Sequence, residues 1–317
     1  MHLVFRGVRE GIFAMFLLLM FASCNNFSTH VFGSSNSDSL SFNEEINKVA
    51  QAKPLLLNKW DSLRRNQITF VIDTLDPVSI KDQKKQLKDS LRKEFDKHPK
   101  HVFLTFDDGP LVGSFAIDSL SKAKNVKLSA FLVGRHAAMG KGRQRDLQRY
   151  LDNPLVACYN HSYTHGFNKF ANFYSNVQMS YEDFVKNEND LNLKHKIARL
   201  PGRNIWIYDD VRTIDLTSGA ATADKLFANG YKVYGWDVEW RINSLTGVPV
   251  QSLEGTFNKM RNFLNNKSSQ TPNNVVLLMH DDMFQTRNGR KLLADLIDLL
   301  KKENYQFEVM EDYPVKY

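Results

Sequence analysis

The chain of 317 residues is long enough for one sizeable domain with extensions, because single domains commonly contain about 100 to about 250 residues. Its 42% hydrophobic and 24% charged residues are typical of a globular protein and exclude a disordered chain. The net charge is +7, from 42 basic and 35 acidic residues. The densest charged stretch, Lys81 to Lys97, alternates basic with acidic residues and lacks the repeated aromatic side chains that stack on bases. We therefore expect a solvated helix face there and no nucleic-acid partner.

The N-terminus has the features of an export signal. Two arginines precede an apolar run, Ile12 to Ala22, which is too short to span a bilayer as a helix of about twenty residues. The run ends in Phe21-Ala22-Ser23-Cys24, which resembles the lipobox of bacterial lipoproteins with Phe21 in place of the usual Leu. The resemblance implies a lipoprotein signal peptide over residues 1–23 and a lipid on Cys24 that anchors the mature protein to the membrane. The alternative is an ordinary secretory signal with an incidental cysteine.

The segment that follows is polar. Residues 24–41 are rich in Ser and Asn, which predicts a flexible tether between the anchor and the folded part. We therefore expect a cell-envelope protein, a membrane-anchored lipoprotein that faces the periplasm or the cell exterior. The only other cysteine, Cys158, lies in an apolar strand-like run, so we expect a small core residue and no disulfide framework.

Residues 42–99 are predicted to form a mainly helical N-terminal extension. Helical signals run from Glu44 to Arg65 and from Ile80 to Lys97, where Leu87, Leu91 and Phe95 recur every four residues. Between these segments, Ile68 to Ile72 has the β-branched and aromatic content of a strand.

Residues 100–317 alternate short apolar runs with helical stretches. The runs lack polar alternation, which is typical of buried parallel strands covered by helices. The predicted strands are Val102 to Phe106, Leu128 to Val133, Pro154 to Tyr159, Ile197 to Leu200, Lys232 to Trp236 and Val275 to Met279. The sequence therefore predicts an α/β domain with a distorted (β/α) barrel. In such barrels the functional residues lie at the carboxyl ends of the strands.

Two groups of polar residues follow predicted strands. Asp107 and Asp108 stand in Thr-Phe-Asp-Asp-Gly-Pro, where two neighbouring carboxylates need a cation or divided roles to stay ionised together. The same hexapeptide is compatible with an ordinary Asp-rich turn. His161 and His165 are four residues apart, a spacing that places both imidazoles on one side of a helical turn, as in metal sites. Two histidines and one carboxylate leave coordination positions for water and substrate.

Four motifs occur in a characteristic order: TFDDGP, HSYTH, RLPG and LLMHDD. In this order they resemble the motifs of the NodB-type polysaccharide deacetylases, carbohydrate esterase family 4, over Lys100 to about Tyr305. The resemblance implies a barrel of the NodB type and a divalent metal, with zinc as the default. It assigns the metal ligands to Asp108, His161 and His165, the general base to Asp107, the arginine that pairs with the base to Arg199, an oxyanion-binding backbone N–H to Gly202, and the general acid to His280.

One motif departs from the family pattern. The family has an Asp-Trp pair that orients the acid histidine and lines the acetyl pocket, whereas the nearest match here is Glu239-Trp240. Asp237 and Glu239 alternate onto the same side of a strand, so either carboxylate is a candidate partner of His280, and we favour Glu239. Arg203 and Trp206, which follow the RLPG motif, add a cation and an aromatic ring that we expect to contact sugar. Trp240 is expected to contact substrate as a wall of the acetyl pocket.

The implied reaction is hydrolytic removal of N- or O-linked acetyl groups from a polysaccharide or oligosaccharide. The expected partner is an acetylated glycan, and no protein partner is implied. Two other hypotheses stay open, a catalytically silent glycan-binding lipoprotein with the same fold and a glycosidase. The second needs paired acids about 5 Å or more apart across a sugar bond, which the adjacent Asp107 and Asp108 do not suggest.

Overall fold

A computed structural model of the protein describes residues 56–65, 77–243 and 246–316. The expected signal peptide, the tether and the strand-like run Ile68 to Ile72 lie outside these residues. In the described part, no helix combines the length and the apolar character that a membrane span requires.

The described strands are β1 (His101–Gly109), β2 (Leu128–Leu132), β3 (Val156–Asn160), β4 (Ile197–Ala198), β5 (Ile205–Tyr208), β6 (Val211–Ile214), β7 (Lys232–Val233), β8 (Val238–Glu239), β9 (Asn274–His280) and β10 (Gln306–Phe307). The α-helices are α2 (Leu56–Arg64), α3 (Pro77–Phe95), α4 (Ser114–Lys124), α5 (Gly134–Ala137), α6 (Lys141–Asp152), α7 (Phe170–Ser175), α8 (Val177–Leu191), α9 (Ala220–Ala228), α10 (Leu253–Asn266) and α11 (Arg287–Lys302). Short 3-10 helices are η2 (His165–Asn168), η3 (Thr217–Gly219), η4 (Asp281–Phe284) and η5 (Met310–Asp312).

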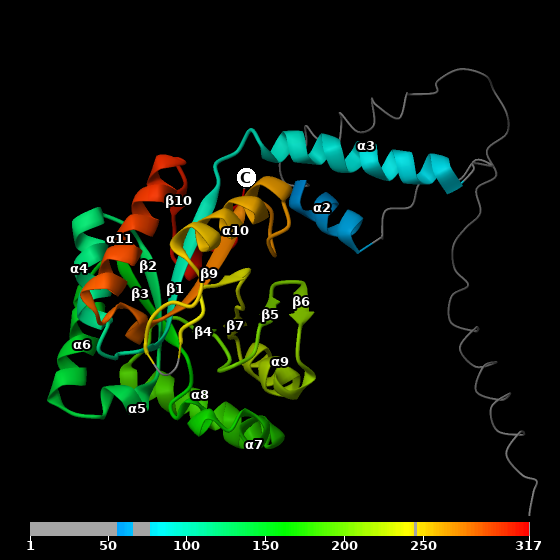
Figure 1. Ribbon diagram of the computed structural model, residues 1–317. Coiled ribbons are helices and arrows are strands. Elements are labelled where there is room, and N and C mark those ends of the chain that lie inside the picture. Colours follow the sequence, from blue (N-terminus) through cyan, green and yellow to red (C-terminus); the bar gives the residue numbers. More distant parts are fainter. Residues whose placement is uncertain (1–55, 66–76, 244–245, 317) are drawn as a thin grey trace, which may run out of the picture. The chain divides into compact units, whose positions relative to one another are not determined.

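These strands form one curled mixed sheet in the order β6-β5-β7-β4-β3-β2-β1-β9-β8, with β10 paired to β1 (Figure 1). The central strands from β7 through β4, β3, β2, β1 and β9 to β8 are parallel, as the continuous apolar runs predicted. The helices α4, α6 and α11 lie together over one side of the sheet. This architecture confirms the predicted distorted (β/α) barrel.

One part of the sheet was not predicted. The strands β5 and β6 form an antiparallel hairpin, and β5 also pairs antiparallel with β7. The hairpin therefore adds antiparallel pairing at one edge of an otherwise parallel sheet.

The sheet is buried on both faces. Along β1, Val102, Leu104 and Phe106 pack in one hydrophobic cluster, whereas Phe103 packs in another. Successive residues of a strand point to opposite faces, so this split means that helices or loops cover each side. A third cluster joins α8 and α9 to β5 and β7.

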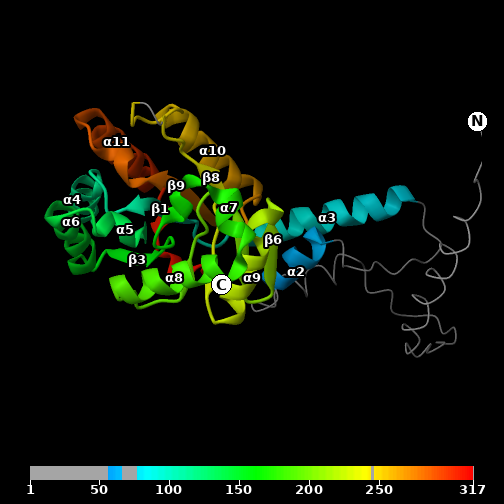
Figure 2. The same cartoon turned by 90° about the horizontal axis from the view of Figure 1, so that it is seen from below.

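The two helices that precede the sheet lie side by side (Figures 1 and 2). Leu87, Leu91 and Phe95 are buried, so the predicted four-residue period forms the packed face of α3. The ring of Trp60 from α2 meets that of Phe95 edge-on, with centroids 5.4 Å apart. The α3 helix begins at Pro77, a residue well suited to the first turn of a helix because its missing N–H has no partner there.

Candidate metal centre and active site

The parallel strands bring the predicted motifs to one end of the sheet. The β1 strand ends in the Asp107-Asp108 pair, β3 leads directly into His161, and β9 ends at His280. Asp107 and His280 are direct neighbours across β1 and β9. The chemistry-bearing residues therefore share the carboxyl edge of the sheet, as expected for such barrels.

Three side chains form a candidate metal centre. Single ligand atoms of Asp108, His161 and His165 all lie within 4.8 Å of one another. The Oδ1 atom of Asp108 is 3.1 Å from His165 Nε2 and 3.6 Å from His161 Nε2. The arrangement places one carboxylate oxygen and two imidazole nitrogens around a common point.

The other ring nitrogens of the two histidines are already engaged. His161 Nδ1 donates to the backbone oxygen of Arg199 at 2.9 Å, and His165 Nδ1 lies 2.7 Å from Asn168 Oδ1. Partners of this kind fix the tautomer and the orientation of a metal-binding imidazole. The Nε2 lone pairs are thus directed toward Asp108.

The electrostatics of Asp108 suit a cation site. Burial alone would raise the pKa of this carboxyl, but the imidazoles of His165, His161, His280 and His136 outweigh it, and the pKa is lowered. Its Oδ1 atom is buried without a hydrogen-bond partner. A buried, unsatisfied carboxylate oxygen between two imidazole nitrogens fits a divalent metal ion.

The backbone that carries the ligands is not the predicted helical turn. His161 follows β3 in an irregular loop, and Ser162 and His165 have positive φ values of 63° and 55°. From His165 to Asn168 four consecutive residues are left-handed, and a Cβ on Gly166 would lie 2.9 Å from the ring of Phe173. A tight loop, and not a helical turn, therefore brings the two histidines together, with their imidazole centroids 5.1 Å apart.

Asp107 is paired with a buried arginine. Arg199 Nη1 donates to Asp107 Oδ1 at 2.9 Å and to Thr105 Oγ1 at 2.7 Å. The remaining guanidinium nitrogens donate to the backbone oxygens of Tyr234 and Gly235, so the fully buried Arg199 is held on all sides. The second oxygen of Asp107, Oδ2, is 3.5 Å from His161 Nε2 and faces the metal centre.

Within the described residues, neither Asp237 nor Glu239 forms a hydrogen bond or an ion pair with His280, the predicted general acid. His280 Nδ1 is buried without a hydrogen-bond partner, although Glu239 lies on the neighbouring strand β8, opposite Leu278. Asp237 is engaged elsewhere, because it accepts hydrogen bonds from the backbone nitrogens of Gln270 at 2.5 Å and Val276 at 2.8 Å. Burial raises the pKa of Asp237 to about 7. The expectation that either carboxylate can face His280 is therefore wrong for Asp237, and for Glu239 it stays a prediction.

Three of the residues predicted to bind substrate have different surroundings. Gly202 has a φ of 65°, and a Cβ there would meet the ring of Phe170 at 2.6 Å, so only glycine fits this position without a shift. Arg203 is nearly buried and donates to Ser218 Oγ and to the backbone oxygen of Gly202. Its contacts stabilise the loop after RLPG, and its predicted contact with sugar is untested.

Trp240 is fully buried in the main hydrophobic core. Its indole Nε1 donates to the backbone oxygen of Gln251 at 2.8 Å, and its ring meets that of Phe284. These contacts account for its position as a core residue, and its place in an acetyl pocket stays a prediction.

The sequence analysis missed two polar residues around the site. His136 follows β2 and its Nδ1 donates to the backbone oxygen of Asp108 at 2.6 Å. Asp281 follows His280 and accepts hydrogen bonds from Gly113 N, Ser114 Oγ and Tyr150 Oη. His136 lies four residues past the end of β2, within α5, so the rule that found His161, a polar side chain just past a strand, points to it less directly.

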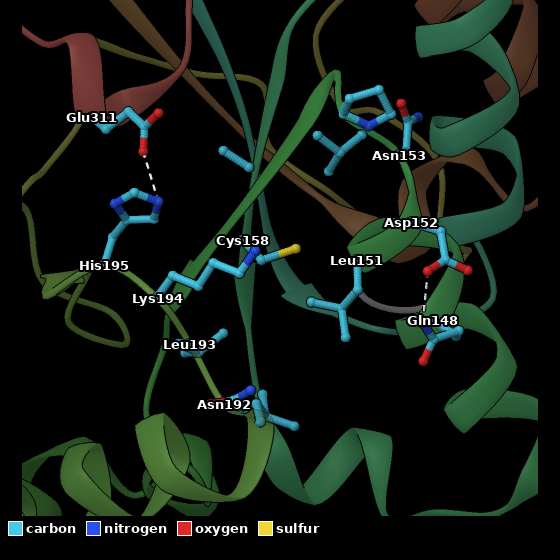
Figure 3. A pocket seen from close by; sticks show the side chains of 14 residues that line it. Gln148, Leu151, Asp152, Asn153, Cys158, Asn192, Leu193, Lys194, His195 and Glu311 are labelled. Carbon is cyan, nitrogen blue, oxygen red and sulfur yellow. Dashed lines mark hydrogen bonds and ion pairs between the residues drawn. The ribbon is translucent and has the colours of Figure 1, made fainter.

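A separate pocket opens beside the first residues of β3, away from these motifs. It has a volume of about 370 Å³, and Cys158 lies in its wall while His195 and Glu311 form an ion pair at 2.9 Å nearby (Figure 3). Burial raises the pKa of the Cys158 thiol to about 12, so the thiolate is not populated at neutral pH. Cys158 therefore has no features of a nucleophile, in agreement with its predicted role as a small packing residue.

A curled α/β sheet with a two-histidine, one-aspartate centre at the carboxyl ends of its strands is typical of metal-assisted hydrolases. Residues 95–196 match the family model described as polysaccharide deacetylase. The chitin disaccharide deacetylase of Vibrio alginolyticus is 26% identical, over 67% of this chain and 71% of that protein. A CE4 esterase of Streptococcus mutans shares the fold, with a TM-score of 0.52 and 23% identity over 69% of this chain and 89% of that chain. The family match and the curated relative support a polysaccharide deacetylase.

Proposed function

We propose that the protein removes acetyl groups from an acetylated glycan with the help of one divalent metal ion. The observation that carries the proposal is the convergence of Asp108, His161 and His165 on one point, beside an aspartate, Asp107, that is paired with a buried arginine. The three ligands would hold the ion and leave positions open. When bound, the ion would make a water molecule acidic and polarise the acetyl carbonyl.

The residues of the chain then have separate tasks. Asp107 accepts the proton of the attacking water, because the Arg199 guanidinium orients its Oδ1 and leaves Oδ2 toward the centre. His280, across the strand pair from Asp107, donates a proton to the departing sugar nitrogen or oxygen. The backbone N–H of Gly202 binds the developing oxyanion, the role that the family resemblance assigns to it.

One relative supports a particular class of substrate. The Vibrio protein is a chitin disaccharide deacetylase, which favours N-acetylglucosamine units for this chain over O-acetylated hemicellulose. We therefore place oligosaccharides of chitin and the glycan strands of peptidoglycan first among the candidates.

An acetate-release screen tests the proposal. The purified chain, stripped of metal and reloaded with Zn²⁺, is incubated with chitin oligosaccharides, peptidoglycan and O-acetylated xylan. We expect acetate from at least one of these and none after chelation. Binding without acetate release would support the catalytically silent glycan-binding protein, and release of new reducing ends would support a glycosidase. Either result would overturn the proposal.

We also propose that Cys24 carries a lipid and anchors the protein at the membrane. The support is the apolar run that ends in Phe21-Ala22-Ser23-Cys24, followed by a polar segment. Cells that express Cys24→Ala should release the protein from the membrane fraction. The matched control is Cys158→Ala, which removes the other cysteine and should stay membrane-bound. Retention of Cys24→Ala at the wild-type level would contradict the anchor.

A further inference from the structure

A cavity of about 590 Å³ lies between α2, α3 and the end of α10. Of the nine described residues that line it, five are basic and none is acidic. The basic residues are Arg64, Lys84, Lys88, Arg92 and Lys267. The cavity is at the opposite end of the sheet from the metal centre, because α3 leads into the amino end of β1 whereas the metal centre lies at its carboxyl end.

Helix geometry explains how the cations gather. Lys84, Lys88 and Arg92 are four residues apart, so they lie on one face of α3. The acidic residues of the same helix, Asp82 and Asp89 among them, fall on other faces at 100° per residue. The alternating charges of this stretch therefore separate in three dimensions, and the expected mixed, solvated face is basic on the side of the cavity.

The two arginines of the cavity donate to uncharged backbone groups. Arg64 donates to the backbone oxygens of Ser269 and Gln270, and Arg92 donates to that of Asn266. The Nε atom of Arg92 is buried without a hydrogen-bond partner. Neutral carbonyl groups satisfy donors but leave the positive charge uncompensated.

Three carboxylates act on two of the cavity cations. Lys267, whose side chain is fully buried, pairs with Asp96 at 2.6 Å. Asp61 and Asp237 interact electrostatically with Arg64. Burial lowers the pKa of Lys267, and the charges of Lys100 and Arg92 add to this effect despite Asp96. The cations of the cavity thus repel one another, which an anion would relieve.

We propose that this cavity binds a phosphate group. Two guanidinium groups and several ammonium groups around one hollow match the charge and the several oxygens of a phosphate ester better than a single carboxylate. Trp60 and Leu63 line the same cavity and provide apolar surface for the group that carries the phosphate. The phosphate belongs either to a soluble ester or to the headgroup of an anionic lipid, and the experiment below separates these sources.

The test uses the full chain and two probes, inorganic pyrophosphate and vesicles of phosphatidylglycerol mixed with phosphatidylcholine. The variant is Lys88→Glu, because this side chain is exposed and makes no contact on which the fold depends within the described residues. The matched control is Lys93→Glu, which makes the same charge change on the same helix outside the cavity. Thermal unfolding of both variants checks that the fold is intact.

We expect binding that weakens with salt and falls about tenfold or more in Lys88→Glu, while Lys93→Glu binds as the wild type does. Pyrophosphate binding with this pattern identifies a soluble phosphate ester as the ligand, and vesicle binding alone identifies a lipid headgroup. The proposal is overturned if neither probe binds or if both variants lose binding equally. Acetate release should be unchanged in Lys88→Glu, so the result is independent of the proposed deacetylase activity.

Discussion

The candidate metal centre and the cluster around Asp281 both lie at the carboxyl edge of the sheet but differ in how their polar atoms are satisfied. Asp108 Oδ1 and His280 Nδ1 are both buried without hydrogen-bond partners. Asp281, one residue after His280, accepts from Gly113 N at 3.0 Å, Ser114 Oγ at 2.6 Å and Tyr150 Oη at 2.7 Å. The first region thus contains buried polar atoms without a protein partner, whereas the carboxylate of the second is hydrogen-bonded by three protein donors.

The same contrast appears in the protonation of the two aspartates. Imidazole neighbours overcome burial and lower the pKa of Asp108. Burial dominates at Asp281 and raises its pKa to about 6, because the hydroxyl and amide donors around it lower the pKa less and the charge of Asp282 raises it further. A carboxylate that is kept ionised and unsatisfied suits cation binding, whereas one that is fully hydrogen-bonded suits the joining of β9 to α4 and α6.

Removal of the carboxylate at the metal centre should have the largest effect. Asp108→Ala takes away one of three ligands, so we expect loss of both bound metal and acetate release. Metal analysis of the purified variant and an acetate assay measure these. The exposed Asp298→Ala on α11 is the control and should keep both. Normal metal content in Asp108→Ala would rule out the assigned centre.

A smaller effect is expected when the proton acceptor alone is removed. Asp107→Asn nearly keeps the shape of the side chain and can still accept from Arg199, so metal should stay bound. Turnover should fall by about 10²-fold or more, the usual scale of general acid–base catalysis. Acetate release near the wild-type rate with metal bound would show that Asp107 is not the base.

The stability of the cluster around Asp281 should depend on pH. The folded pKa of Asp281 is about 6 against an ordinary 3.8, so the folded state binds the proton more tightly. The stability from this group is fully present below about pH 4 and is lost as the pH rises through about 6. At about 1.4 kcal/mol per pKa unit, the loss is at most about 3 kcal/mol.

Asp281→Asn cannot ionise, so its free energy of unfolding should rise relative to the wild type as the pH goes from 4 to 7. Urea denaturation at several pH values measures this difference. Taking the difference between the variant and the wild type at each pH also removes the contributions of other titrating groups, because both proteins share them. Asp298→Asn should show no such trend, and a flat difference for Asp281→Asn would contradict the pKa shift.

The smallest effect is expected at His136, which donates a hydrogen bond to the backbone of Asp108. His136→Ala removes the donor to the Asp108 carbonyl, and we expect metal affinity to fall about tenfold, as for other residues that orient a ligand. Competition with a chelator measures the affinity. His136→Asn can place an amide nitrogen near the position of Nδ1 and should recover most of it. Equal losses in both variants would assign a different role to the imidazole.

The sequence predicted the parts of the molecule that depend on local pattern. A continuous apolar run gave β9, and the polar residues just after strands located Asp108, His161 and His165 at one edge of the sheet. A polar side chain also follows β2, but His136 lies four residues past the end of that strand, within α5. The candidate site residues could therefore be predicted from their positions at the ends of strands.

Other features depend on contacts that no local pattern encodes. Alternation placed Asp237 and Glu239 on one side of a strand, but β8 contains only Val238 and Glu239, and Asp237 accepts hydrogen bonds from the backbone nitrogens of Gln270 and Val276.

The β5–β6 hairpin, in contrast, did have a local signal. This signal is the Asp209-Asp210 turn, with a φ of 47° at Asp209, between two β-branched and aromatic runs.

Arg199 supports two residues of the candidate site through two different groups. Its guanidinium holds Asp107, whereas its backbone oxygen holds His161 Nδ1. Only the first of these can be altered by changing the side chain, since every amino acid supplies the same carbonyl. In evolution, the aspartate can therefore lose its support in a single substitution, whereas the carbonyl that holds the histidine is kept whichever residue stands at position 199.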